Sequence, residues 1–131
     1  MKMKPTLPIN LPKGWTCHFE LKQVDVDELD DVLVYEDYSL VPNNEDTQIN
    51  SIEIEKYING DTVCFEDDIP DGQCRIGGLD ADYMELPEFN ELQFIVTAPD
   101  GDCIKIDINL KERKKESLDV VISLISRLLS F

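Results

Sequence analysis

The feature that most constrains the fold is an alternating run near the C-terminus. In residues 103–110 the chain alternates between large aliphatic residues and polar or charged ones. An extended strand points successive side chains to opposite faces, so this pattern predicts a strand with one buried face. A slip of one residue would expose every aliphatic side chain of the run, namely Ile104, Ile106, Ile108 and Leu110. The run therefore predicts a fixed register in a sheet that is covered on one side.

Similar runs recur along the chain and predict a mainly antiparallel sheet of about six to seven strands with several hairpins. The Asn59-Gly60 pair is a strong hairpin signal because both residue types tolerate positive φ. Residues 79–90 are acidic and are expected to be irregular. A competing interpretation makes Ile54–Ile58 one helical turn. The expected strands cover residues 15–24, 32–41, 48–58, 62–66, 73–76, 91–98 and 103–110.

The chain ends in a predicted amphipathic helix that begins between Lys111 and Ser117 and runs to about Ser130. Its apolar stripe needs a surface to cover, and one face of an antiparallel sheet is the natural one. The predicted fold class is therefore α+β, with the sheet covered on one face by the C-terminal helix. The stripe consists of Leu118, Val121, Ile122, Ile125, Leu128 and Leu129.

The organisation expected from these elements is one domain with an N-terminal extension. A length of 131 residues suits a single core. Residues 1–14 contain three prolines and predict an extended arm, and part of it could lie on the domain as an edge strand. Residues 15–131 form the α+β domain. The basic N-terminus is not followed by an apolar segment, and the C-terminal apolar tract is shorter than a membrane span, so we expect a cytoplasmic protein with no membrane partner.

Charge is the most informative property of the composition. The formal net charge is −16, and it is unevenly distributed. Residues 25–102 contain 23 acidic residues and two basic ones, Lys56 and Arg75. Phosphates would be repelled by such a segment, so nucleic acid is not an expected partner. A concentrated negative field instead steers basic proteins toward the surface and accelerates their association.

Chemistry-bearing motifs are absent from the sequence. His18 is the only histidine, and it falls on the polar side of its predicted strand. A catalytic Ser-His or Cys-His pair would have to use this residue, so we do not expect one. The four cysteines form no CxxC pair and are expected to be free thiols. The acidic loops depart from the calcium-loop pattern at its glycine. We therefore expect a protein that is not an enzyme and that uses no metal or cofactor.

These observations predict an acidic binding protein that neutralises or regulates a basic partner protein, such as an immunity protein against a nuclease-type toxin. This is an analogy at the level of physical class. Loops on a rigid sheet and tyrosines among acids are the expected contact points. The predicted partner-binding residues are Tyr35, Glu36, Asp37, Tyr38, Asp67, Asp68, Asp71, Asp80, Asp82 and Tyr83.

The alternative is a phage or bacterial accessory or structural domain whose acidity serves solubility. Apolar residues outside the main helix stripe favour this interpretation, because they would be buried if two copies met through the C-terminal helix. Those residues are Val120, Leu124 and Phe131.

Overall fold

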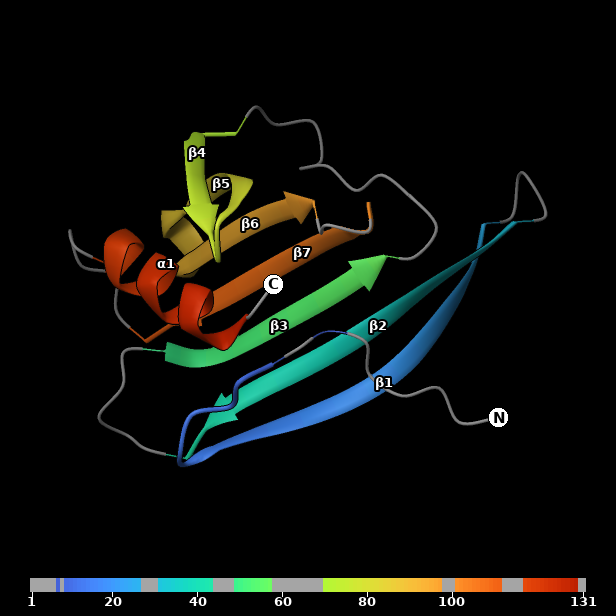
Figure 1. Ribbon diagram of the computed structural model, residues 1–131, viewed down its shortest axis with the longest axis horizontal. Helices are drawn as coiled ribbons and strands as arrows, with labels where there is room; N and C mark the ends of the chain where they lie inside the picture. The colour runs from blue at the N-terminus through green and yellow to red at the C-terminus, as the bar shows by residue number, and fades with distance from the viewer. Residues whose placement is uncertain are drawn as a thin grey trace.

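The protein is an antiparallel sheet with a single helix on one face. The computed structural model describes residues 7, 9–26, 31–43, 49–57, 70–97, 101–111 and 117–129. Seven strands form one sheet in the order β1-β2-β3-β7-β6-β5-β4 (Figure 1). The elements are β1 (Trp15–Val26), β2 (Asp31–Pro42), β3 (Ile49–Tyr57), β4 (Gly72–Ile76), β5 (Leu79–Leu86), the short 3-10 helix η1 (Pro87–Phe89), β6 (Glu91–Thr97), β7 (Cys103–Leu110) and α1 (Ser117–Leu128).

The sheet is built from two meanders that meet in its middle. Strands β1 to β3 follow one another along the sheet, and β4 to β7 do the same from the opposite edge. The join is the antiparallel pair of β3 and β7, in which Ile54 lies opposite Ile106. These are the two strands whose alternation is clearest in the sequence. Their pairing brings the acidic middle of the chain against its C-terminal part.

We define the covered face of the sheet as the face that packs against α1. This face holds the hydrophobic core. Helix residues Val121, Ile125 and Leu128 are buried against it, so the predicted stripe is confirmed at these positions. The α1 helix lies beside β4, which curls over toward it (Figure 1), and Gly77 N–H donates to Ser126 Oγ at 3.1 Å. The sheet residues of this core include Leu40, Ile52, Ile54, Leu92, Phe94, Val96, Ile104, Ile106 and Ile108.

In its described residues, 7 and 9–14, the N-terminal arm packs beside the end of α1 and does not form an edge strand of the sheet. Ile9 makes an isolated antiparallel bridge with Leu129. Asn10 N–H donates to the carbonyl of Leu128 at 2.7 Å, which satisfies one of the carbonyls that the end of a helix leaves open. Leu7 is buried in the core cluster. The arm thus closes one end of the covered face.

The expectation that residues 79–90 are irregular was wrong. Most of this segment forms β5, which pairs with β4 through a two-residue turn. That turn consists of Gly77 and Gly78, with φ of 57° and 87°, and glycine adopts such angles without strain. The strand was missed because it lies next to the sheet edge, where few of its residues are buried. The predicted strand at residues 62–66 and the Asn59-Gly60 turn lie outside the described residues.

Candidate functional site

The face opposite α1 is the candidate functional surface, and we call it the open face. It is a consequence of strand alternation. In β3 the burial of Ile52 and Ile54 on the covered face places Glu53 and Glu55 on the open one. In β7 the same alternation places Asp107 on the open face, and in β2 it places Asp37 there. Acidic residues predicted only as the polar side of separate strands are therefore gathered on one surface.

Four of these residues form what we call the carboxylate row: Asp37, Glu53, Glu55 and Asp107. The strand register makes them neighbours. Asp37 lies directly opposite Glu55 across β2 and β3, and Glu53 lies directly opposite Asp107 across β3 and β7. Like charges placed opposite each other on a sheet are destabilising. The row is thus a concentration of negative charge that costs stability in the isolated chain.

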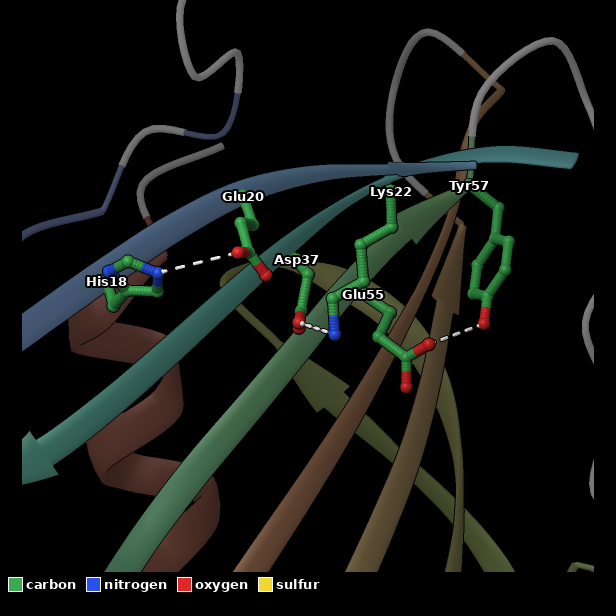
Figure 2. A network of polar contacts seen from close by, with 6 residues as sticks. All are labelled: His18, Glu20, Lys22, Asp37, Glu55 and Tyr57. Atoms are coloured by element: carbon green, nitrogen blue, oxygen red, sulfur yellow. Dashed lines mark hydrogen bonds and ion pairs between the residues drawn. The ribbon is translucent and has the colours of Figure 1, made fainter. Parts of the chain in front are cut away.

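Asp37 is the most buried member of the row, with 5% of its surface exposed. Its Oδ2 lies 2.8 Å from Lys22 Nζ, and Figure 2 shows this pair beside Glu20 and Glu55 on the open face. Its Oδ1 is buried and has no hydrogen-bond partner. A buried carboxylate oxygen without a donor is costly, so this atom carries a desolvation penalty in the isolated chain.

The ionisation of two further members reflects mainly their partial burial, with a smaller contribution from neighbouring carboxylates. Partial desolvation raises the pKa of Glu53, and the nearby Asp37 carboxylate raises it further. Burial raises the pKa of Asp107 to about 6, with Glu91 and Glu55 adding to the effect while Lys105 opposes it. Asp107 Oδ1, like Asp37 Oδ1, is buried without a hydrogen-bond partner. Both shifts have the direction expected for carboxylates that lack sufficient positive charge nearby.

A pair of tyrosines stands at one end of the row. Tyr35 and Tyr57 lie opposite each other in β2 and β3, and their rings stack with centroids 5.0 Å apart and planes inclined by 27°. The Tyr57 hydroxyl donates to Glu55 Oε2 at 2.6 Å (Figure 2). Burial, together with the Glu55 carboxylate, raises the pKa of Tyr57 well above its usual value. The pair adds an aromatic anchor to an otherwise charged surface.

The residues predicted from β2 are divided between the two faces. Tyr35 and Asp37 lie on the open face, whereas Glu36 and Tyr38 are each 1% exposed on the covered face. The Tyr38 hydroxyl donates to Glu36 and accepts from Leu7 N–H at 3.1 Å. Glu36 also lies opposite Lys56 in β3. The Nζ atom of Lys56 lies 3.6 Å from Asp102 Oδ2. Because this burial separates Glu36 and Tyr38 from solvent, we leave them out of the candidate surface.

The residues predicted from the acidic turns lie away from the row, around β4 and β5. Asp71 Oδ2 accepts from Glu85 N–H at 2.6 Å, a contact that orders the chain entering β4. Asp80 is exposed and lies 3.7 Å from Arg75. Asp82 and Tyr83 are half-buried, and Tyr83 packs against the core. Asp67 and Asp68 lie outside the described residues. A cavity of about 350 Å³ at this end is lined by Gln73, Cys74, Asp80, Ala81, Asp82, Ile95 and Thr97.

Sequence reasoning missed the row itself. Glu53, Glu55 and Asp107 were recognised as the polar sides of their strands, but only the pairing of β3 with β7 makes them neighbours. That pairing joins residues about fifty positions apart in the chain, and no local pattern encodes it. The signal that could have pointed to the row is the presence of both Glu53 and Glu55 on the polar side of β3.

Metal and thiol chemistry have no arrangement to support them in the described part of the chain. No three His, Cys, Asp or Glu side chains there are placed to hold a metal ion. Cys17, Cys74 and Cys103 form no disulfide with one another, and burial raises the pKa of both Cys17 and Cys74, which makes these two thiols less reactive.

The chain matches no family model, no curated protein and no solved structure. No helix among the described residues is long and apolar enough to cross a membrane.

Proposed function

We propose that the chain is an acidic binding protein that neutralises or regulates a basic partner protein, and that the partner contacts the open face over the carboxylate row. The observation that carries this proposal is Asp37, whose side chain is nine-tenths buried while its Oδ1 has no donor. An arginine or lysine of a partner placed over the row would offset the charge of this buried carboxylate. The function is binding without catalysis.

Electrostatics supports a cation as the group that binds. A guanidinium or ammonium group placed over the row would offset the repulsion among Asp37, Glu53 and Asp107 that the isolated chain carries. Hydrogen bonds in which both groups are charged are shorter and roughly twice as strong as neutral ones. Raised pKa values at Glu53 and Asp107 mean that binding a cation would also favour loss of their protons.

The shape of the open face supports a protein partner over a small molecule. The row extends across β2, β3 and β7, which is a broad surface and not a closed pocket. The half-buried Tyr35 at its end adds an aromatic side chain beside which an arginine can lie. Basic proteins that bind phosphates, such as nucleases, carry clustered arginines and lysines. An immunity protein against a nuclease-type toxin is the example of this class that we favour.

The test compares two charge-matched double variants. Glu53→Gln with Asp107→Asn neutralises two of the four members of the row, and Asp80→Asn with Glu88→Gln removes the same charge from exposed positions in β5 and η1. Binding to an immobilised basic ribonuclease, to lysozyme and to a hexa-arginine peptide is measured by calorimetry or surface plasmon resonance, at two salt concentrations on either side of about 150 mM.

We expect the row variant to lose about tenfold or more in affinity for the ribonuclease and the control variant to lose less than about threefold, since one well-placed charged contact contributes at least 1.4 kcal/mol. Neutralising a crowded row should stabilise the fold, so the loss cannot come from unfolding. Equal losses in the two variants would mean that only total charge matters. That result would sink the proposal and favour the alternative in which acidity serves solubility.

A further inference from the structure

The two edges of the sheet are protected to very different degrees. The β4 edge is five residues long, begins at Gly72 and packs beside α1. The β1 edge is 12 residues long, contains no proline or glycine, and keeps one register with β2 along its whole length. Long regular edges are templates for another strand, and proteins usually shorten, bulge or cover them. β1 is therefore the edge on which a further strand can add.

The backbone groups that face this edge can be assigned from the register. Asn43 N–H donates to the carbonyl of Gly14 at 2.6 Å, so this pair is hydrogen-bonded. Because such pairs alternate in an antiparallel ladder, the even-numbered residues of β1 bond to β2. Pro42 lies opposite Trp15 and has no N–H to donate. This agrees with the assignment, because an odd-numbered residue such as Trp15 is then not hydrogen-bonded to its partner in β2. The N–H and carbonyl groups of Cys17, Phe19 and Leu21 consequently point away from β2.

The side chains of β1 fit a second copy of the same strand in one register. Two copies can pair antiparallel over most of β1 with the two-fold axis at either Glu20 or Leu21. An axis at Glu20 would place two glutamates directly opposite each other. An axis at Leu21 places Glu20 of each copy opposite Lys22 of the other. It also joins the two Leu21 side chains, which are 36% exposed in the single chain.

We infer that this chain forms a homodimer in which two β1 strands pair antiparallel with the two-fold axis at Leu21, so that the two sheets become one. The backbone N–H and carbonyl groups of the odd-numbered residues of β1 then form a ladder of hydrogen bonds between the two copies. Glu20 and Lys22 face each other in non-hydrogen-bonded pairs, the closer of the two kinds of antiparallel pair. This inference does not require the proposed function. It shares one residue with the surroundings of the carboxylate row, because Lys22 Nζ lies 2.8 Å from Asp37 Oδ2 in the single chain.

The charge of the two chains sets the conditions for association. Each copy carries a formal charge of −16, which opposes dimerisation at low salt. The backbone ladder and the Leu21 contact are insensitive to salt, whereas the long-range repulsion is screened over about 8 Å at physiological ionic strength. We expect the dimer to be more stable at about 150 mM salt than at about 10 mM.

The first experiment measures mass by analytical ultracentrifugation over a range of concentrations. The wild-type chain should shift from 15.0 kDa toward twice that mass as concentration rises. Glu20→Lys and Lys22→Glu should each be monomeric, since each places like charges in contact twice. An equimolar mixture of the two variants should recover a heterodimer, because Lys at position 20 then meets Glu at position 22 and the other contact is unchanged.

The second experiment tests the register by disulfide formation in a Cys17→Ser, Cys64→Ser background. Cysteine is introduced singly as Glu20→Cys, Leu21→Cys or Lys22→Cys, and intermolecular cross-linking is followed under mild oxidation. Leu21→Cys should cross-link fastest, since only residues at the axis face their own copy at a Cα separation that a disulfide spans.

Three results would overturn the inference. The first is a wild-type chain that stays monomeric at every concentration up to the millimolar range. The second is fastest cross-linking through Glu20→Cys or Lys22→Cys. The third is a dimer that survives both charge variants but is lost on Val120→Lys, which would place the contact on α1, where Val120 is 50% exposed.

Discussion

The covered and open faces of this sheet are made by the same strands and have opposite consequences for stability. In β3, Ile54 is buried beneath the helix layer while its neighbours Glu53 and Glu55 point the other way. In β7, Ile106 is likewise buried, and the next residue, Asp107, points to the open face. Burial of the aliphatic side chains stabilises the fold, whereas crowding of the carboxylates destabilises it. Surfaces that cost stability in isolation are where a binding role is most readily placed.

The covered face is not wholly apolar, and its exception is instructive. Glu36, Lys56 and Tyr38 are buried at the part of the face that the N-terminal arm closes. There the polar groups have partners, with the Tyr38 hydroxyl joining Glu36 to the backbone of Leu7. On the open face, Asp37 Oδ1 and Asp107 Oδ1 have none. Satisfied buried polar groups fix a structure, whereas unsatisfied ones cost stability.

The largest expected difference between the faces is in side-chain packing. Ile106→Ala on the covered face should reduce the free energy of unfolding by about 2–5 kcal/mol, because it leaves a cavity under α1. Ile95→Ala, the same change at a half-buried position on the open face, should cost about 1 kcal/mol. Urea denaturation followed by circular dichroism measures both. Similar costs for the two variants would mean that the open face is also packed against something.

A smaller difference is expected between two tyrosine hydroxyls. Tyr38→Phe removes the group that joins Glu36 to Leu7 N–H and should cost about 1–3 kcal/mol, because buried partners lose their hydrogen bonds. Tyr57→Phe removes a donor to Glu55 on the open face and should cost about 0.5–1 kcal/mol, since water can replace it. Loss of the arm contact should also speed proteolysis of the N-terminus in Tyr38→Phe alone, which separates it from a general loss of stability.

The smallest expected effect comes from a substitution on the open face that should increase the free energy of unfolding. Because the pKa of Asp107 is raised to about 6, its charged form is disfavoured in the folded state. The resulting cost is absent below the unfolded pKa near 4 and is complete above about pH 6. Asp107→Asn should therefore stabilise the fold at pH 7.5 by on the order of 1 kcal/mol, allowing for solvent screening, and give no gain at pH 3.5.

The matched control for this variant is Asp80→Asn, at an exposed position. It should change the free energy of unfolding by less than about 0.5 kcal/mol at both pH values. Thermal unfolding across pH 3.5 to 8 compares the two variants with the wild type. If Asp107→Asn destabilised the fold at pH 7.5, the carboxylate row would not be repulsive. The two faces would then not differ in the sign of their electrostatic contribution to stability.

How far the sequence predicted the structure depended on how complete each local pattern was. The bounds of β7 were predicted without error, and those of β6 within one residue at its end, because each run has a continuous apolar side that is buried. Segment β5 was missed because its two buried residues, Ala81 and Met84, are three positions apart and do not follow a two-residue alternation. On β1, the inward side was predicted correctly for Trp15 and Phe19, which pack on the core, but Leu21 extends beyond the cover and is exposed.

The candidate site was less predictable than the fold. Tyr35 and Asp37 were named from the sequence and lie on the open face, while Glu36 and Tyr38 alternate with them and face inward. Four consecutive residues of a strand cannot share one surface, and applying the two-residue period would have separated them. Glu53 and Asp107 could not be paired in advance, because the order of strands is not a local property.

By itself, the sequence determined the alternating strands, the amphipathic helix at the C-terminus, the α+β class and the concentration of negative charge between residues 25 and 102. Each of these depends on residue type and on spacing over a few positions, which is the range of strand and helix periodicity. Tertiary structure alone decided that β3 lies beside β7, which assembles the carboxylate row, and that the 12-residue strand β1 stands at an edge of the sheet. Those features depend on contacts between distant segments, and such contacts are selected by the packing of the whole core beneath α1 and not by any one stretch of the chain.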